Sequence, residues 1–537
     1  SHGFVSIASF NRYFQKIYHM SPREYKKMSV RKKNFEKPLQ ENVRKGYLTV
    51  ETTANMEERS IVIEPKKNGI KSIQNPFCKM INVGMAKTLL HYNIQEQLIQ
   101  LQKELHFSYV RIECFLSNAL IPRTVEKEDY CFTATKSILD FLCRNNLIPF
   151  IELGKNTYVY MKEFGQNMKG YSYSVNPKFH CMLEAFCRFV SEHYDREWCG
   201  KWIFELWKPE NETVEQYLKG YEIIKELIGK YLPGAKLGGP GYDVGRTDYD
   251  LSELLRGFAA KKLVPDFISA HLLQIDEAGE ERERQLILPS SKDDFRKKQK
   301  ELLVEIRKVW KNCPLYITEL NSCMVPRTYV TASRYWMIMD SYDDVSSPKI
   351  YRTPGIGLLS HEGIRLPAYF AYDFLEKMGK EIVEEGDGYC VTRSRKDQFQ
   401  ILAYTHVFFS DYSFLLNEQG ESLQDVYGCF PKTSPISMTF HLKGIKNGIY
   451  RIHRCLLDSF HGSVLDIVQG EYLEGSISEI EFVRRILSFS EEEKKYLSET
   501  CVPEERTTYQ KVEEGELTVS SALEPHSVCL WEISLEI

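Results

Sequence analysis

Two acidic side chains stand where short apolar runs give way to polar residues. Glu319 lies in the run PLYITEL at 314–320, and Glu210 follows the run WIFELW at 202–207. If both runs are strands of one parallel barrel, the two carboxylates lie at carboxyl ends of strands, where barrel enzymes place their chemistry. Such a pair can act as nucleophile and general acid. The alternative for Glu319 is a structural ion pair.

The elements that would position these carboxylates alternate along the chain from about residue 76 to 370. The runs typical of buried strands are FSYVRIECFL, LIPFIEL, WIFELW, AKLGGPG, DFISAHLL and PLYITEL, with helices such as EQLIQLQKEL and TATKSILDFLCRN between them. This alternation predicts an α/β fold, a (β/α)8 TIM barrel over 76–375. An open doubly wound sheet is the alternative, but no glycine-rich phosphate loop follows the first strand.

Past residue 380 the pattern changes to strands separated by turns. The strand-like runs are GYCVTRS, QFQILAYTHVF, SMTFHL, GIYRIHRCLL, GELTVSS and SVCLWEISL. They predict a β-sandwich over 376–537. The strand-like runs YLTVETT and RSIVIEP precede the barrel, and we expect residues 47–75 to complete this sandwich.

Charge divides the 537 residues unevenly. Residues 1–46 hold 11 Lys and Arg against 3 Asp and Glu, a net charge of +8. The whole chain has a formal net charge of −4, so the remainder carries −12. A basic head on an acidic body indicates different partners for the two parts, unless the head is only a solvated linker.

Fourteen cysteines are scattered along the chain without a CxxC pair, which argues against a zinc module and suits a reducing cytosol. We therefore expect no metal and no cofactor.

No run approaches the roughly 18 apolar residues of a membrane span. No cleavable signal opens the chain, so we expect a cytoplasmic protein without a membrane partner. The chain starts without Met inside a patterned segment, which indicates a fragment of a longer protein.

The basic head contains the segment GFVSIASFNRYFQKIYHMSPREY at 3–25. It resembles the last helix-turn-helix and closing helix of AraC-type regulators through Gly3, Phe4, Ser9, Phe10, Arg12, Phe14, Lys16, Ser21, Pro22 and Tyr25. The resemblance implies that residues 1–46 are the C-terminal remnant of a helix-turn-helix domain plus a basic linker. The side chains that would face DNA are Ser6, Ser9, Asn11, Arg12 and Lys16.

The earlier helices of such a DNA-binding domain are missing from this chain. We therefore expect specific DNA binding only from a full-length domain, and weak, salt-sensitive binding at most from this fragment. The alternative is that Phe10 and Phe14 simply pack one helix onto its neighbour.

From about Gly84 onward the chain resembles glycoside hydrolase family 39, which contains β-xylosidases and α-iduronidase. The resemblance rests on an ordered series: YVR at 109–111, PFIELG at 149–154, FELW at 204–207, KLGGPG at 236–241, DFISAH at 266–271, YITELNS at 316–322, GLLSHEGIRLPAY at 357–369, HGSVLDI at 461–467 and SALEPHSVCLWEI at 521–533. It implies a nucleophile in a Thr-Glu context on the seventh strand and an acid/base in an Asn-Glu-Pro motif after the fourth. Glu319 matches the nucleophile.

The acid/base motif is altered in this chain. Aligned on Trp207, Lys208-Pro209-Glu210 stands where the family has Asn-Glu-Pro. Proline cannot donate a proton, and a lysine replaces the asparagine that binds the sugar 2-hydroxyl. Glu210 comes one residue late, which on a strand turns a side chain to the opposite face. Side chains in a loop do not follow this strict alternation. Glu210 and Glu212 therefore both remain candidates for a displaced acid/base.

Other positions that line the family's pocket also differ here. Glu113 replaces a histidine, Lys155 replaces an aromatic residue, and Leu273 replaces a tyrosine. Lysines near Glu319 would hold its carboxylate ionised, or would receive a uronate or sugar phosphate. The residues that we expect to contact a ligand are Arg111, Glu113, Lys155, Lys208, His271 and Asn321.

These features predict a transcriptional regulator whose barrel senses a carbohydrate, a xyloside or a uronate, with little or no turnover. The competing hypothesis is an active retaining β-xylosidase-like hydrolase, with Glu319 as nucleophile and Glu210 as displaced acid/base. A third hypothesis is a barrel that binds no ligand and serves only to dimerise the protein. A homodimer is also expected under the sensor hypothesis. Whether the chain is an enzyme depends on residues 208–210.

Overall fold

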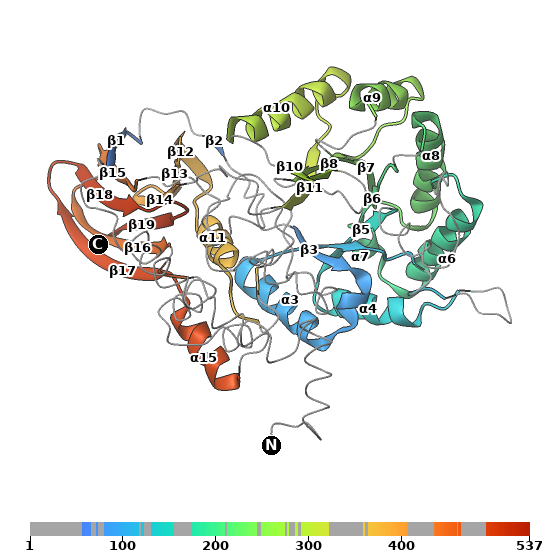
Figure 1. The fold of residues 1–537 in the computed structure, drawn as a ribbon, viewed down its shortest axis with the longest axis horizontal. Coiled ribbons are helices and arrows are strands. Elements are labelled where there is room, and N and C mark those ends of the chain that lie inside the picture. The colour runs from blue at the N-terminus through green and yellow to red at the C-terminus, as the bar shows by residue number, and fades with distance from the viewer. Residues whose placement is uncertain are drawn as a thin grey trace, which may run out of the picture.

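The structure is a computed structural model. It describes residues 56–65, 71–72, 80–117, 120–122, 130–154, 174–209, 212–243, 249–273, 276–278, 285–287, 292–321, 358–359, 363–405, 434–458, 460–462 and 490–536. The predicted helix-turn-helix remnant and linker at 1–46 lie outside this part of the chain. The fold is a (β/α)8 barrel with a C-terminal β-sandwich, which confirms the predicted fold class (Figure 1).

Seven parallel strands of the barrel lie within the described residues and follow one another in chain order across the sheet. They are β3 (Met80–Met85), β4 (Tyr109–Glu113), β5 (Ile148–Leu153), β6 (Ile203–Leu206), β7 (Lys236–Asp243), β8 (Ile268–Leu273) and β11 (Leu315–Asn321). Among these strands β6 is the fourth and β11 is the seventh. These are the two strands at which the resemblance implies the acid/base and the nucleophile.

Helices connect the strands and cover the outside of the sheet (Figure 1). They are the 3-10 helix η1 (Ala86–Leu90) and the α-helices α3 (Tyr92–Leu105), α4 (Thr133–Arg144), α6 (Pro177–His193), α7 (Arg196–Cys199), α8 (Val214–Tyr231), α9 (Leu251–Ala260), α10 (Lys292–Val309) and α11 (Pro367–Glu376). A short antiparallel pair, β9 (Asp276–Ala278) and β10 (Gln285–Ile287), separates β8 from α10. Helix α8 is the next helix after β6. A capping box between Thr213 and Gln216 fixes its start a few residues beyond the altered motif.

The interior of the barrel changes from apolar to polar along the strands. A buried apolar cluster fills one level, formed by Met80, Phe150, Ile203 and Phe267. Because side chains on a strand alternate with a period of two, the next inward positions lie two residues further along each strand. Those positions are Asn82, Glu152, Glu205 and Ser269, and all four are buried. The sequence therefore places a polar layer directly below the carboxyl ends of the strands.

The sandwich consists of two sheets around a second apolar core that includes Phe440 and Trp531. One sheet has the order β1 (Glu57–Ile63), β15 (Ile436–Lys443), β18 (Glu516–Leu523). The other has the order β17 (Glu504–Val512), β16 (Gly448–Leu457), β19 (Val528–Glu536), β14 (Gln398–Tyr404), β13 (Tyr389–Arg395), β12 (Glu381–Gly386), β2 (Lys71–Ser72). Strands β1 and β2 precede the barrel in the chain, so the barrel is inserted between strands of the sandwich. Helix α15 (Glu491–Thr500) leads into β17.

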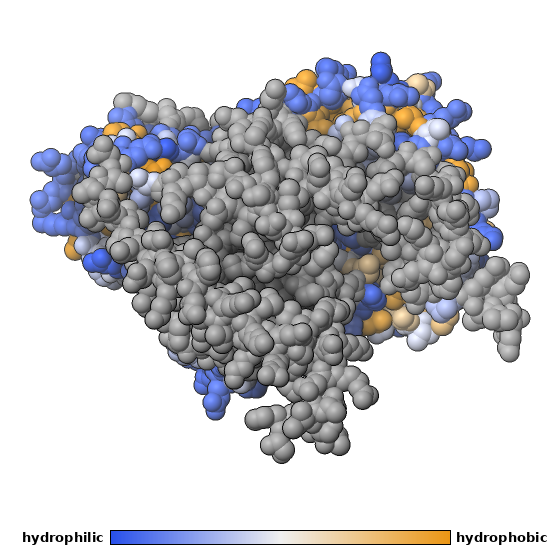
Figure 2. Space-filling model, viewed as in Figure 1, coloured by the Kyte–Doolittle hydropathy of each residue, from blue (hydrophilic) through white to orange (hydrophobic). Residues whose placement is uncertain are grey.

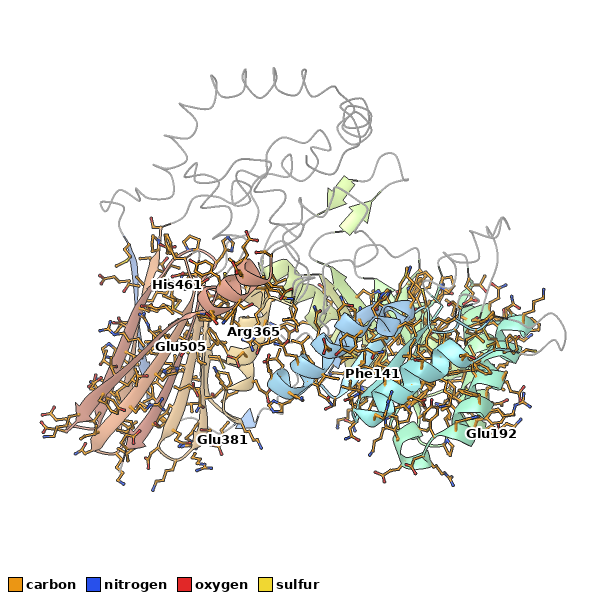
Figure 3. The ribbon with its side chains drawn as sticks, turned by 90° about the horizontal axis from the view of Figure 1, so that it is seen from below. Phe141, Glu192, Arg365, Glu381, His461 and Glu505 are labelled. Carbon is orange, nitrogen blue, oxygen red and sulfur yellow. The ribbon has the colours of Figure 1, made fainter. Side chains whose placement is uncertain are left out.

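Helix α11 and the residues before it join the two domains. Phe370 of α11, Leu457 of β16 and Leu530 of β19 belong to the same buried cluster as the barrel core. Arg365 lies between the domains (Figure 3), and its guanidinium donates to the Glu104 carboxylate of α3 at 2.6 Å. Apolar packing across the junction predicts that barrel and sandwich form one cooperative unit.

The described surface of the sandwich's outer edge is mainly hydrophilic (Figure 2). Strand β17 accounts for part of this because most of its side chains are exposed. Among the described residues, no helix combines the length and the apolarity that crossing a bilayer requires.

Candidate functional site

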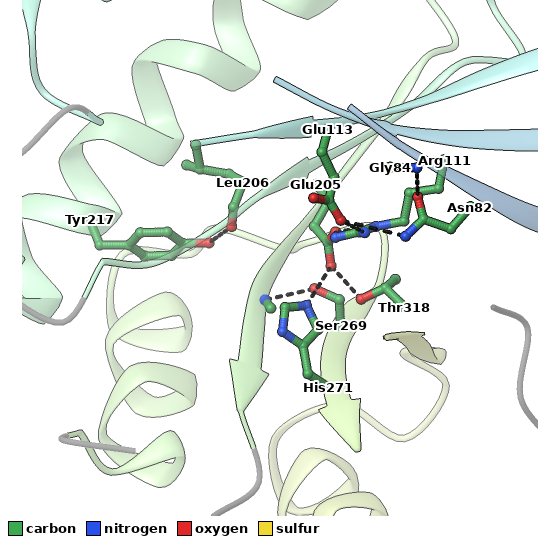
Figure 4. A network of polar contacts seen from close by, with 11 residues as sticks. Asn82, Gly84, Arg111, Glu113, Glu205, Leu206, Tyr217, Ser269, His271 and Thr318 are labelled. Carbon is green, nitrogen blue, oxygen red and sulfur yellow. Dashed lines mark hydrogen bonds and ion pairs between the residues drawn. The ribbon is translucent and has the colours of Figure 1, made fainter. Parts of the chain in front are cut away.

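The polar layer of the barrel is organised around Glu205 of β6, which is completely buried. Arg111 of β4 donates to Glu205 Oε2 from Nε at 3.0 Å and from Nη2 at 2.8 Å. Thr318 of β11 donates its hydroxyl to Oε1 at 2.6 Å. His271 of β8 places Nε2 3.9 Å from Oε1 (Figure 4). One carboxylate therefore links the second, fourth, sixth and seventh strands of the barrel.

Arg111 carries this network on to Glu113 and Asn82. Its Nη1 donates to Glu113 Oε1 at 2.8 Å, and Glu113 is the residue that replaces the family histidine. Asn82 Nδ2 reaches the same oxygen at 3.5 Å, and Asn82 Oδ1 accepts from the Gly84 amide at 2.8 Å. Glu113 lies at the end of β4 with part of its side chain exposed. Arg111 thus holds the Glu113 carboxylate at the carboxyl end of β4.

The surroundings of Glu205 keep it ionised. Burial disfavours the charged carboxylate, but the charges of Arg111 and His271 and the hydrogen bonds from Thr318 and Ser269 outweigh that effect, so the pKa of Glu205 lies below its ordinary value. A carboxylate with a lowered pKa is a poor proton donor near neutral pH. Glu205 is therefore suited to hold its neighbours in place rather than to donate a proton.

Trp207 and His271 both approach the same glycine of β7. A side chain on Gly241, which has a φ of 64°, would lie 2.6 Å from Trp207 Cδ1 and 3.2 Å from His271 Nε2. The Gly241 amide donates to Ser269 Oγ at 2.8 Å. The KLGGPG run thus supplies a residue without a side chain where two rings approach β7.

Lys208, which follows β6 closely, is buried, and both its backbone and its ammonium are hydrogen-bonded. Lys208 is only 3% exposed, and its ammonium donates to the carbonyls of Pro209 at 3.2 Å and Glu212 at 2.5 Å. The same ammonium lies 4.1 Å from the centroid of the Tyr249 ring. The backbone amide of Lys208 donates to the Pro240 carbonyl at 2.9 Å. These bonds explain how the fold accommodates a buried lysine: its ammonium binds the start of the next helix.

Pro209 and Glu212 lie on either side of the residues that the structure does not describe. Pro209, which the resemblance sets at the acid/base position, is buried. Glu212 is also buried, and its Oε1 accepts from the Ser174 amide at 3.1 Å. Glu212, the other candidate for a displaced acid/base, therefore binds the backbone before α6. This hydrogen bond gives its carboxylate a structural role.

Glu319 lies on the seventh strand, as the resemblance implied. Strand β11 pairs with β8 in parallel, and the register places Glu319 beside His271 and Asn321 beside Leu273. The register shifts between Ile317 and Glu319, so Thr318 is an extra residue at this point. Without that irregularity Glu319 would be one position out of phase with His271.

Several predicted residues lie outside the described part of the chain. They are the ligand-binding Lys155, the displaced acid/base Glu210, and the DNA-facing Ser6, Ser9, Asn11, Arg12 and Lys16. The prediction did not include Glu205, Thr318, Ser269 or Asn82. A glutamate inside the apolar run WIFELW was the signal for Glu205, because an acidic side chain on a fully buried strand needs a cationic partner.

The chain matches a known family over half its length. The sequence model described as "Glycosyl hydrolases family 39" covers residues 60–334. A β-xylosidase of Geobacillus stearothermophilus is 24% identical over 63% of this chain and 75% of its own. A β-xylosidase of Caldicellulosiruptor saccharolyticus is 25% identical over 57% of this chain and 70% of its own.

Solved structures show the same fold. The monomeric β-xylosidase of Caulobacter crescentus has a TM-score of 0.69 at 21% identity, covering 89% of this chain and all of its own. A family 39 enzyme of Xanthomonas axonopodis pv. citri has a TM-score of 0.66 at 18% identity, covering 91% of this chain and all of its own.

Proposed function

Because the chain belongs to glycosyl hydrolase family 39, we propose that its barrel binds a carbohydrate and turns it over slowly or not at all. The observation that carries this proposal is Pro209, which stands where the family has its acid/base glutamate. A proline has no proton to give, and protonating the leaving oxygen contributes on the order of 10²–10⁴-fold to such reactions. The neighbouring carboxylates of Glu205 and Glu212 already have structural partners.

The ligand would sit at the carboxyl ends of the strands. There Glu113, supported by Arg111, would accept hydrogen bonds from sugar hydroxyls. Trp207, partly exposed beside Gly241, would offer an apolar ring to the sugar face. We retain Lys155, Lys208, His271 and Asn321 as proposed ligand contacts. The candidate ligands are a xyloside and a uronate.

The sensing role follows from the basic head. We propose that residues 1–46 belong to an AraC-type DNA-binding domain, and that carbohydrate binding to the barrel alters the affinity of the full-length protein for DNA in the cytoplasm. Support comes from the motif at 3–25 and the net charge of +8. Ligand control requires unequal affinity of the sugar for two states of the protein, and dimerisation is one way to provide it.

A hydrolase remains the second candidate, because Glu319 is in register with His271 on the seventh strand and the relatives above are named β-xylosidases. In that case Glu319 attacks the anomeric carbon as nucleophile, and Glu210 protonates the leaving oxygen.

Aryl β-xylosides test the choice directly. We expect the wild-type chain to hydrolyse them slowly at most, because the acid/base position holds a proline. Hydrolysis of xylobiose by the wild type that disappears in the Glu319→Gln variant would instead establish the enzyme. Because aryl leaving groups need little protonation, the panel should include xylobiose.

A thermal-shift screen with xylose, xylobiose and glucuronate then tests carbohydrate binding. Under the proposal at least one of these raises the melting temperature, and Glu113→Ala reduces that rise. If none of these sugars raises the melting temperature, the result favours a barrel that has a structural role and binds no such ligand.

A further inference from the structure

The sandwich carries a histidine and a cysteine on the face of β16 turned away from its own core. Tyr450 and Ile452 of the same strand pack into the sandwich core. His453 and Cys455 are two residues apart, so both project from one side of the strand. The distance from His453 Nε2 to Cys455 Sγ is 3.3 Å.

Strand β17 adds a carboxylate to this pair. Its antiparallel register sets Glu505 directly opposite Cys455. Glu505 Oε2 lies 4.0 Å from His453 Nε2. The imidazole nitrogen, the thiol sulfur and the carboxylate oxygen therefore all lie within 4.8 Å of one another. These separations suit three donors around one tetrahedral ion.

A second contact orients the imidazole for this task. Thr507 stands opposite His453 in the register, and its hydroxyl oxygen lies 2.9 Å from His453 Nδ1. When Nδ1 carries the proton and donates to that hydroxyl, the lone pair of Nε2 points toward Cys455 and Glu505. Histidines that bind metals are held in this way by a hydrogen bond at their other nitrogen.

Charged groups of both signs surround the Cys455 thiol. Besides its burial, the thiol feels the ammonium of Lys377 and the carboxylates of Glu505, Glu532 and Asp373. Lys377 is itself bound to Asp373 at 2.8 Å, which offsets its charge. Glu532 stands opposite His453 on β19.

We propose that His453, Cys455 and Glu505 form a zinc site that ties the edge strand β17 to β16. Nitrogen, sulfur and carboxylate oxygen are the donors that zinc takes, whereas magnesium and calcium need oxygen alone. Cys455 is buried while Glu505 is 63% exposed, so the ion can enter from solvent and keep water in its fourth position. On binding, the thiol releases its proton to solvent.

This inference departs from the expectation of no metal in the chain. That expectation rested on the lack of CxxC spacing, a pattern of metal loops. Here two donors come from one strand, and the third lies 50 residues further on, opposite them only because of the strand register. Figure 3 shows Glu505 on β17, near α15.

Cobalt is the probe for this site, because a thiolate bound to Co²⁺ gives a near-ultraviolet charge-transfer band. We expect the metal-free chain to bind one equivalent of Co²⁺ with such a band, and Zn²⁺ to displace it. Cys455→Ser should abolish the band, whereas Cys529→Ser, which alters another buried thiol on β19, should retain it. Thr507→Val should weaken the affinity on the order of 10–100-fold, as loss of such supporting hydrogen bonds does.

Glu505→Gln separates metal binding from folding, because this exposed side chain can be replaced without disturbing a buried core. It should keep the melting temperature of the metal-free chain but lower the Co²⁺ affinity at least tenfold. The proposal is overturned if the wild type shows no saturable thiolate band, or if the band persists at full intensity in Cys455→Ser.

Discussion

Arg111 and Glu205 form an ion pair inside the barrel in which both side chains are fully buried, with Arg111 Nε and Nη2 at 3.0 Å and 2.8 Å from one carboxylate oxygen. Buried pairs of this kind are costly to break because the remaining charge has no solvent. The pair joins the second strand to the fourth, immediately below the site that we assign to the ligand.

Removing Arg111 should therefore destabilise the chain strongly. We expect Arg111→Ala to lower the free energy of unfolding by about 3–5 kcal/mol, because it leaves the buried Glu205 carboxylate without its cation. Urea denaturation followed by tryptophan fluorescence measures this change. The matched control is Lys201→Ala, which breaks an exposed pair with Glu197 and should cost less than about 1 kcal/mol. Equal losses in the two variants would refute a special role for the buried pair.

The lowered pKa of Glu205 predicts how stability depends on pH. A carboxyl whose pKa is lower in the folded state stabilises the fold above the pKa it has when unfolded, near 4.5. That contribution is lost as the pH falls through the lower, folded value. In Glu205→Gln this titration is absent. We compare the two proteins between about pH 5 and 3, the range around the ordinary carboxyl pKa. As the pH falls, the free energy of unfolding should decrease more steeply in the wild type than in Glu205→Gln, by up to about 1.4 kcal/mol per pH unit. Parallel curves for the two proteins would contradict the assignment.

Restoring the family motif should create catalysis. The variant Lys208→Asn, Pro209→Glu, Glu210→Pro rebuilds Asn-Glu-Pro after Trp207, and we expect hydrolysis of xylobiose, whose leaving group needs protonation, to rise on the order of 10²–10⁴-fold. Adding Glu319→Gln to this variant should remove the gain, since both carboxylates are needed. A folded triple variant with no gain would mean that more than the acid/base has been lost from the site.

Gly241 should tolerate no side chain. We expect Gly241→Ala to cost about 1–3 kcal/mol of stability and to weaken sugar binding, because the added Cβ meets Trp207 and the backbone has a positive φ. The control is Gly229→Ala on α8, where a Cβ meets nothing within 4 Å, and which should stabilise the chain by up to about 1 kcal/mol. Denaturation midpoints and the sugar-induced thermal shift report both effects. A Gly241→Ala protein with unchanged sugar binding would remove Trp207 from the proposed site.

The sequence allowed the barrel to be predicted because its strands are apolar runs of the length expected for buried parallel strands. Four of the predicted runs contain β4, β5, β6 and β8, and two overlap β7 and β11, which extend one or two residues further. The prediction missed β3, whose MINVGM mixes Asn and Gly into the run, and β17, whose largely polar EERTTYQKV lies exposed at a sheet edge. In these two strands neither alternation nor apolar length gives a signal.

The candidate site was predictable only in part. Glu319 and the loss of the Asn-Glu-Pro motif follow from local spacing within short motifs. The Arg111–Glu205 pair spans 94 residues, and the bond from Thr318 to Glu205 spans 113. Such contacts depend on strand order and on the shifted register of β11, which no local pattern contains.

The insertion of the barrel between strands of the sandwich has a mechanical consequence. Strand β1 enters the sandwich first and pairs in parallel with β15, far along the chain. A pulling force applied to the chain before β1 therefore acts first on the sandwich. It loads the hydrogen bonds between β1 and β15 before any strand of the barrel. For the same reason, a fragment cut at residue 376 would leave β1 and β2 without the strands that hold them. The sandwich therefore cannot be cut out as one continuous segment of the chain.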